Sequence, residues 1–321
     1  MKRRRSRSAG APPDEMNALI LHTTPPDDPG VNRLKDEFDL REAAGNVAAA
    51  LPGSTVCAVR GHAREIMALI ELHAPEVVVN LCEAPLGRPE LEPHAAALLE
   101  LLGVRFTGCG SETLALCRRK DLVNPVLRHA GVPVPMEISR MRPAFPCIVK
   151  PSGQDGSAWM CQHSVCENAE ELDRAIACAK VPVLVEEFLP GREFAVSLWG
   201  CAEPEHVSLG ETVFLRGLRL VTYAAKWEVE SADFADSPLV YDSEIAPKLR
   251  AAIVAAARAA WRAVGARQAL RVDVRLDAAG NPRVLDVNPN MEMSPEVGIC
   301  RAVQEAGWSW RDFIASLVAW A

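Results

Sequence analysis

The residues best suited to bind a metal ion are Asp273, Asp286 and Asn288, which lie in two apolar-alternating runs near the carboxyl end of the chain. The runs flank a turn-forming Asp-Ala-Ala-Gly-Asn-Pro segment, so they predict a β-hairpin with a loop longer than two residues. Because side chains alternate along a strand, Asp273 shares one face with Arg271 and Arg275. Asp286 and Asn288 share one face of the second strand, where they can approach Asp273. Carboxylate and amide oxygens suit Mg²⁺, and the alternative is a solvated face whose charges pair across the strands.

A second set of residues is suited to bind phosphate. Lys150 ends a predicted strand and precedes a loop that contains Gly156 and Ser157, where backbone N–H groups and a hydroxyl can lie over phosphate oxygens. The chain has no G-x-x-x-x-G-K-[ST] motif, which argues against P-loop chemistry. Lys120 is by itself an ordinary surface lysine. We expect Lys150→Ala to abolish nucleotide-dependent activity and to leave folding almost unchanged, because a lysine at a loop edge contributes little to the core.

The segment VLVEEFLPGREF could hold a nucleoside. Its apolar strand runs into Glu186 and Glu187, and Phe188 and Leu189 follow. Glu193 is the second residue after a Pro-Gly turn. A strand that crosses between two domains offers backbone groups for a purine edge, apolar side chains for its faces and a carboxylate for ribose hydroxyls. Two domains could therefore clamp a nucleotide here.

The elements that must position these residues begin with alternating strands and helices. Strands are predicted over 17–22, 55–59 and 76–81, and helices over 32–50 and 62–72. The continuous apolar run in the third strand is typical of a strand covered on both faces. The first hundred residues are therefore predicted to form a parallel α/β layer.

The rest of the chain has a mixed pattern. A helix over 93–102 is followed by a Gly-punctuated linker over 104–110. The stretches 140–146 and 228–243 are predicted loops. The other predicted elements are strands over 145–150, 183–187, 194–199, 270–276 and 283–287, and helices over 111–130, 170–179 and 244–264.

Composition limits the class of protein. The 321 residues are 49% hydrophobic and 24% charged, which is typical of a globular protein. The hydrophobic stretches are strand-sized, which argues against a transmembrane protein. The net charge of −7 argues against a nucleic-acid-binding fold, although the arginine-rich start could touch RNA. No apolar segment follows those arginines before Asp14, so a signal peptide is not expected and a cytoplasmic location is.

The ten cysteines are scattered through apolar contexts and form no C-x-x-C pair. We therefore expect reduced, core-filling residues rather than a disulfide framework. Cys161 and Cys166 are the closest pair, and without further ligands at suitable spacing they do not predict a zinc site.

Taken in order, these motifs resemble the ATP-grasp fold, and within it the D-alanine–D-alanine ligase family. The resemblance extends over 16–315 and rests on FPCIVKPSGQDGSAWM, VLVEEFLPGREF, YAAKW and RVDVRLDAAGNPRVLDVNPN. It implies an α/β (α+β) protein with a three-domain ATP-grasp fold. The implied parts are a disordered basic tail (1–15), an N-terminal parallel α/β, or pre-ATP-grasp, domain (16–108), a central subdomain with the flexible loop (109–187) and a C-terminal subdomain with the metal site (188–321).

The resemblance also assigns roles. It implies ATP as the nucleotide and two Mg²⁺ ions, with Mn²⁺ as an alternative metal. The implied phosphate ligands are Lys120, Lys150 and Lys226, with Ser157 in the loop that closes over them. The implied adenine and ribose contacts are Glu186, Glu187, Phe188, Leu189 and Glu193. The implied metal ligands are Asp273, Asp286 and Asn288, and the implied catalytic residues are Arg271 and Lys226.

The implied reaction joins a carboxylate to an amine. The carboxylate attacks the γ-phosphorus of ATP to give an acyl phosphate, and the amine then displaces phosphate. Arg271 would stabilise the tetrahedral oxyanion, and its alternative role is pairing with Asp286 across the strands. Closure of the loop would protect the acyl phosphate from water. Small-molecule substrates are expected, and the resemblance alone implies a homodimer.

Several positions depart from the family pattern. Asp286 stands where the family more often has Glu, Glu292 occupies the place of a glycine beside the oxyanion, and Trp159 replaces a loop glycine. Glu83 and Ser294 are the remaining candidate substrate contacts, with Glu83 as a partner for an ammonium group or a solvated loop acid. These departures favour a relative that uses another amino acid or a specialised carboxylate. The alternatives are a true D-alanine–D-alanine ligase and an ATP-binding regulatory protein without catalysis.

Overall fold

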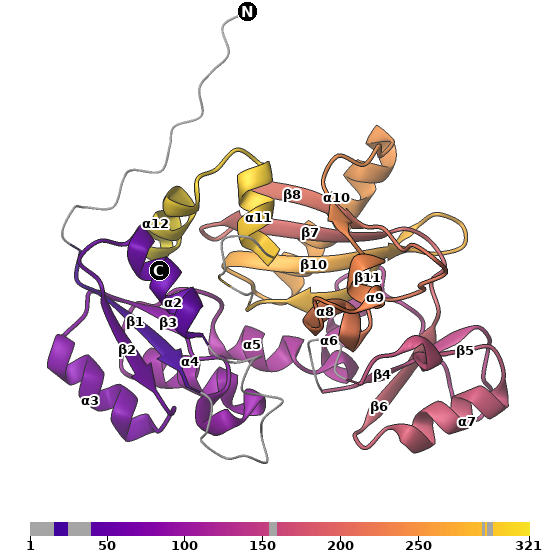
Figure 1. Cartoon of the computed structure of the whole chain (residues 1–321), viewed down its shortest axis with the longest axis horizontal. Helices are drawn as coiled ribbons and strands as arrows, with labels where there is room; N and C mark the ends of the chain where they lie inside the picture. Colours follow the sequence, from indigo (N-terminus) through magenta and orange to yellow (C-terminus); the bar gives the residue numbers. More distant parts are fainter. Residues whose placement is uncertain (1–15, 25–39, 154–158, 291–292, 294–297) are drawn as a thin grey trace, which may run out of the picture. The chain divides into compact units, whose positions relative to one another are not determined.

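The computed structural model describes residues 16–24, 40–153, 159–290, 293 and 298–321 (Figure 1). The chain divides into two compact units. The first combines Met1–Ser111 with Asn290–Ala321, and the second is Glu112–Pro289. The segment after Pro289, predicted as part of the C-terminal subdomain, thus belongs with the N-terminal unit. The predicted domain boundaries stay predictions, and the basic tail lies outside the described residues.

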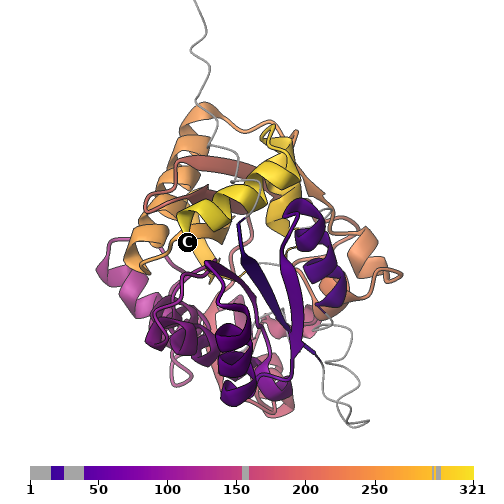
Figure 2. The same ribbon diagram turned by 90° about the vertical axis from the view of Figure 1, so that its left-hand side faces the viewer.

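The first unit contains a parallel sheet with strand order β2-β1-β3. Its strands are β1 (Ala18–Thr23), β2 (Thr55–Val59) and β3 (Val77–Leu81). The residues of β1 are all buried, as expected for a central strand covered on both faces. Figure 2 faces this sheet, drawn in indigo. The predicted parallel α/β layer is confirmed.

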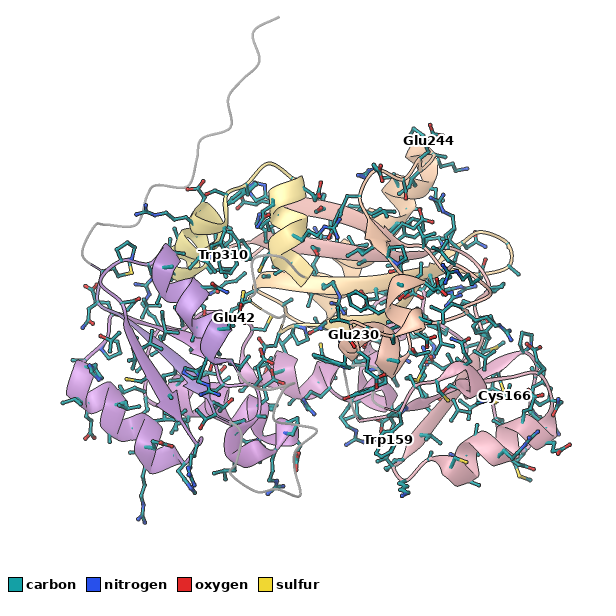
Figure 3. The ribbon with its side chains drawn as sticks, in the orientation of Figure 1. Glu42, Trp159, Cys166, Glu230, Glu244 and Trp310 are labelled. Atoms are coloured by element: carbon teal, nitrogen blue, oxygen red, sulfur yellow. The ribbon has the colours of Figure 1, made fainter. Side chains whose placement is uncertain are left out.

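The first unit also contains helices. They are α2 (Arg41–Ala50), α3 (Ala63–His73), α4 (Glu92–Leu101), α11 (Gly298–Glu305) and α12 (Trp310–Trp320), with short 3-10 turns at Pro85–Gly87 and Pro89–Leu91. The C-terminal helix α12 packs against α2, and the Trp310 indole Nε1 donates to the Asn46 carbonyl over 3.3 Å (Figure 3). The first eight residues of the predicted helix 32–50 lie outside the described residues.

The structure corrects the prediction that 104–110 is a linker. Phe106 bridges Val78 in the parallel direction, and the Val78 N–H donates to the Arg105 carbonyl over 2.8 Å. Thr107 N–H returns a bond to Val78 over 3.0 Å. The segment therefore extends the edge of the sheet beside β3, because its apolar Phe106 is buried there.

The second unit contains two antiparallel sheets. The small sheet has strand order β5-β4-β6, formed by β4 (Cys147–Pro151), β5 (Val165–Cys166) and β6 (Val183–Glu187). Helix α7 (Ala169–Cys178) covers one of its faces and begins at Asn168, whose side chain accepts from the Glu171 N–H. Helices α5 (Ser111–Cys117) and α6 (Lys120–His129) come before this sheet, and the 3-10 turn Gln162–Ser164 precedes β5.

The large sheet has strand order β11-β10-β7-β8-β9. Its strands are β7 (Glu193–Gly200), β8 (His206–Thr212), β9 (Leu239–Val240), β10 (Gln268–Leu276) and β11 (Pro282–Asn288). Helix α10 (Pro247–Ala263) packs on one face, where alternating apolar residues of β7 and β10 such as Leu198 and Val274 are fully buried. The opposite face carries Arg271, Asp273, Arg275 and Glu193, and the buried Trp199 lies at one end of it.

The structure also corrects the prediction that 228–243 is a loop without helices or strands. It contains the short helix α9 (Ala232–Ala235) and strand β9, and α8 (Tyr223–Trp227) precedes it. The Ser231 side chain accepts from the Phe234 N–H and so caps α9, a local signal that the polar composition concealed. Among the residues that the structure describes, every helix is too short or too polar to traverse a lipid bilayer.

Candidate active site

The hairpin β10–β11 brings the predicted metal ligands together. Asp273 and Asp286 are direct cross-strand partners, and Asn288 pairs with Arg271. The register shifts after Asp273, which increases the local twist. Arg271 holds Asp273 in a bidentate ion pair, with Nε–Oδ1 at 2.9 Å and Nη2–Oδ2 at 3.1 Å. The salt-bridge partner of Arg271 is thus a carboxylate two residues along its own strand rather than Asp286 across it.

Asp286 is bound by a lysine from another element. Lys120, the first residue of α6, lies with its Nζ 3.2 Å from Asp286 Oδ1, and the Val287 N–H donates to the same oxygen over 3.1 Å. Burial acts to raise the pKa of Asp286, but the charges of Lys120 and Lys150 lower that pKa below its ordinary value. Lys120 is buried, so it is not the exposed lysine that its local sequence suggested.

Lys150 forms a second buried ion pair. Its Nζ donates to Glu186 Oε2 over 2.9 Å, and the Asn124 amide donates to Glu186 Oε1 over 2.7 Å. Lys150 is 9% exposed and Glu186 2% exposed. The expectation that Lys150→Ala leaves folding almost unchanged therefore needs correction, because the substitution would strand a buried carboxylate.

The two faces of the small sheet carry different kinds of side chain. Lys150 and Glu186 share one face, on which Ile148 and Val165 pack against Phe188. The other face is apolar and packs against α7; it includes Cys166 (Figure 3). Alternation puts Glu187 on this second face, where its Oε1 accepts from the Met136 N–H over 2.9 Å. The predicted nucleotide contact of Glu187 stays a prediction, and in this structure its side chain supports the preceding loop.

The predicted base and ribose segment passes tightly against β10. The Gly191 N–H donates to the Leu276 carbonyl over 3.0 Å, and a Cβ on Gly191 would lie 2.6 Å from that oxygen. Only glycine fits such an approach. Phe188 and Leu189 are buried before this turn, and Glu193 starts β7 after it. The turn therefore fixes Glu193 beside the hairpin β10–β11.

Sequence reasoning assigned no role to Arg275, although it placed Arg275 on the face of Asp273. The structure pairs Arg275 with Glu193 across β10 and β7, with Nη1–Oε2 at 3.1 Å. Alternation along β10 was the signal that could have found it.

The remaining predicted residues are placed as follows. Lys226 lies in α8, with its Nζ 5.3 Å from the centroid of the Trp227 ring. Glu83 follows β3 in the first unit, and its N–H donates to the Leu81 carbonyl over 3.2 Å. Ser157 and Ser294, together with Glu292, lie outside the described residues. Trp159 is described, and its positive φ of 63° is unusual for a bulky residue.

The donor chemistry fits a hard cation. Asp273 and Asp286 supply carboxylate oxygens and Asn288 an amide oxygen, which are the ligands of Mg²⁺ rather than of a soft metal. Within the described ranges, no group of three or more His, Cys, Asp or Glu side chains could hold a metal. A metal at this hairpin would therefore need further oxygen ligands, which a triphosphate supplies.

The arrangement is suited to a metal–triphosphate ligand. Two lysines and one arginine neutralise carboxylates of the same site: Lys120–Asp286, Lys150–Glu186 and Arg271–Asp273. Phosphate oxygens can replace the carboxylates around the lysines, and a divalent cation can replace the lysine and arginine around Asp286 and Asp273. Asp273, Asp286 and Lys120 then keep partners of opposite charge, and Glu186 stays paired where Lys150 binds phosphate without giving up its bond to that carboxylate.

Comparisons with known proteins point to one family. A family model described as the D-ala D-ala ligase C-terminus matches residues 135–319. A D-alanine–D-alanine ligase of Rhizobium meliloti (strain 1021) is 26% identical over 272 residues, which cover 79% of this chain and 83% of that protein. The uncharacterised protein y4sG of Sinorhizobium fredii (strain NBRC 101917 / NGR234) is 30% identical over 254 residues, covering 75% and 73%.

Solved structures agree on the fold. The D-alanine–D-alanine ligase of Bacillus anthracis in complex with ATP superposes with a TM-score of 0.69 at 15% identity, covering 95% of this chain and 96% of that one. The same enzyme in a second crystal structure gives a TM-score of 0.67 at 16% identity, with the same coverage.

Proposed function

The chain belongs to the D-alanine–D-alanine ligase family, and we propose that it joins a carboxylate to an amine through an acyl phosphate made from ATP. The three-domain ATP-grasp fold implied by the sequence and the family relation support an ATP-dependent ligase that forms carbon–nitrogen bonds. The observation that carries the proposal is the cross-strand pair Asp273–Asp286, with Lys120 bound to it.

In the proposed reaction, a carboxylate oxygen attacks the γ-phosphorus of ATP and ADP leaves. The amine nitrogen then attacks the acyl carbon, phosphate leaves, and the amine loses a proton. Lys120 and Lys150 neutralise the phosphates, and Arg271 stabilises the oxyanion on the acyl carbon. Asp273, Asp286 and Asn288 would hold Mg²⁺, which supplies charge neutralisation at the phosphate oxygens. The number of metal ions, predicted as two, is part of this proposal.

The proposed substrates are an amino acid or a specialised carboxylate and a small amine. The positions that differ from the family pattern, including Glu83 in the first unit, support a substrate other than D-alanine. D-Alanine, the substrate named for the curated relatives, is the second candidate. A homodimer and a cytoplasmic location stay predictions.

Calorimetry and a substrate screen test this function. The protein should bind ATP with a Kd that tightens when Mg²⁺ is added, and a screen of amino acids and amines should release phosphate with one pair. The mass of the product should equal the sum of the two substrates less one water. Nucleotide binding with no phosphate release from any pair would support the regulatory alternative, and no adenine-nucleotide affinity at all would refute the proposal.

A further inference from the structure

Arg275 is the only arginine that is buried in the described part of the chain, and it contacts three residues of the segment 186–193. Its guanidinium lies 5.0 Å from the centroid of the Phe188 ring, and its Nε donates to the Gly191 carbonyl over 3.1 Å. Its Nη1 lies 3.1 Å from Glu193 Oε2. One side chain thus reaches the predicted base contact, the glycine turn and the predicted ribose carboxylate.

The Arg275–Glu193 pair is costly to bury. Burial raises the pKa of Glu193 and lowers the pKa of Arg275, and each residue's charge opposes the shift of the other. Two apolar residues of similar volume would be as stable or more stable at such a place. Stability alone therefore does not account for the pair, and its position beside Phe188 indicates a role in ligand binding.

A second Arg–Glu pair on the same sheet provides a contrast. Arg192 and Glu211 pair at 2.6 Å, but the Arg192 side chain is 39% exposed and Arg192 Nη2 also donates to the Glu244 carbonyl. That pair joins the residue before β7 to β8, and Arg192 also bonds the loop that contains Glu244. Arg275 and Glu193 instead lie on the face of the large sheet that carries Asp273.

The carboxylate of Glu193 retains acceptor capacity. Arg275 uses Oε2, and among the described residues no donor contacts Oε1. An ionised carboxylate with one oxygen held by a fixed guanidinium presents the other in a defined direction. A ribose hydroxyl is the donor that the predicted role of Glu193 requires.

We propose that Arg275 is a positioning residue for the nucleotide ribose, because it holds the Glu193 carboxylate so that Oε1 accepts a ribose hydroxyl. This inference rests on the proposed function. Arg275 contacts the ribose only through Glu193, while its guanidinium also braces the Phe188 ring and the Gly191 turn. Its loss should affect recognition of the sugar more than recognition of the triphosphate.

The test compares calorimetric Kd values for ATP and for its 2′-deoxy and 3′-deoxy analogues, all with Mg²⁺. The native protein should prefer ATP over at least one analogue by about tenfold or more, the value of a hydrogen bond to a charged acceptor. R275M and E193Q should each reduce that preference to about twofold or less. R275K should restore part of it, and R275M/E193Q should lose no more than either single variant.

The control is R283M. Arg283 is the neighbour of Arg275 on β11 and pairs with Asp277 in the hairpin loop, so its variant should keep the native preference. If R275M does not fold, R275K keeps a cation beside Glu193 but lacks the planar guanidinium, and it should give a preference between those of the native protein and E193Q.

A native protein that binds all three nucleotides equally would overturn the inference, as would an R275M variant that weakens all three by the same factor. Both results would leave the ligase proposal intact. A native protein that binds none of the nucleotides would refute the ligase proposal itself, and the inference with it.

Discussion

The two faces of the large sheet differ in the side chains that they bury. The face under α10 buries apolar residues such as Leu198, Val274 and Trp261, whose removal from water stabilises the folded protein. The opposite face, with the neighbouring face of the small sheet, holds buried or half-buried ion pairs, and every member except Arg275 is a predicted ligand contact or catalytic residue. We call this second region the charged cluster; its members are Lys120, Lys150, Glu186, Glu193, Arg271, Asp273, Arg275 and Asp286.

The apolar face thus stabilises the fold, whereas the charges of the charged cluster are paired with one another, and in the proposed function a ligand replaces part of this pairing. Each cation of the cluster has a carboxylate partner in this structure. Removing one member should therefore cost stability through the partner left unpaired, as well as binding or turnover. Removing an apolar residue should cost stability alone.

Lys150→Ala should have the largest effect. It leaves the Glu186 carboxylate buried beside Asn124 alone, so the free energy of unfolding should fall by about 3–5 kcal/mol at pH 7. Denaturant unfolding measures this change. K150M/E186Q is the control, and it should lose much less because no charge remains unpaired. A loss below about 1 kcal/mol for Lys150→Ala would mean that the charged cluster behaves like solvated surface.

Leu198→Ala tests the apolar face. Leu198 is fully buried on β7, so its truncation should lower the free energy of unfolding by about 2–5 kcal/mol. The Kd for ATP of the folded variant should stay within about twofold, a limit that corresponds to less than about 0.5 kcal/mol. A large loss of ATP affinity would contradict the expectation that residues of the apolar face affect stability and not ligand binding.

Arg271→Ala should act on turnover. Its bidentate partner Asp273 is about one quarter exposed, so the ion pair is screened more than Lys150–Glu186 and the loss of stability should be smaller. Turnover should fall by about 10² or more and ATP affinity by a few-fold at most, as for loss of an oxyanion contact. Steady-state kinetics and calorimetry separate these values, and normal turnover would assign Arg271 a structural role.

Glu211→Gln should have the smallest effect, because its pair with Arg192 is partly solvated. We expect a loss of about 0.2–1 kcal/mol at pH 7. The hydrogen bond from Arg192 lowers the pKa of Glu211 below its ordinary 4.5. The stabilisation is therefore present above about pH 4.5 and is lost as the pH falls through the lowered pKa. The difference in unfolding free energy between the native protein and Glu211→Gln should be smaller at pH 3 than at pH 7. An equal difference at both pH values would contradict this role of the Glu211 charge.

Sequence patterns predicted the local geometry of the site well. Alternation along two strands was sufficient to expect that Asp286 and Asn288 can approach Asp273, and the structure pairs Asp273 with Asp286 directly. The Pro-Gly signal likewise located the turn that ends at Gly191, since a close backbone approach requires glycine. Both features depend on residues near one another in the chain.

Contacts between distant segments were not predictable in the same way. The charged sequence around Lys120 indicated an exposed helix, and its burial arises only because β11 brings Asp286 to the start of α6. Strand β8 was missed since His206, Ser208 and Gly210 interrupt its apolar pattern, although pairing with β7 buries much of it. Tertiary pairing therefore overrides the local signal in both cases.

The discontinuity of the first unit has a consequence for synthesis. Its parallel strands leave the ribosome early, yet α11 and α12 are made only after the whole second unit, and Phe313 and Leu317 of α12 are buried in the folded protein. The surface of α2 that α12 covers therefore stays exposed to solvent during synthesis of the second unit. The second unit can fold in this interval. Nascent chains halted before Asn290 should accordingly hold the second unit native and the first one incomplete, a natural point for chaperone engagement.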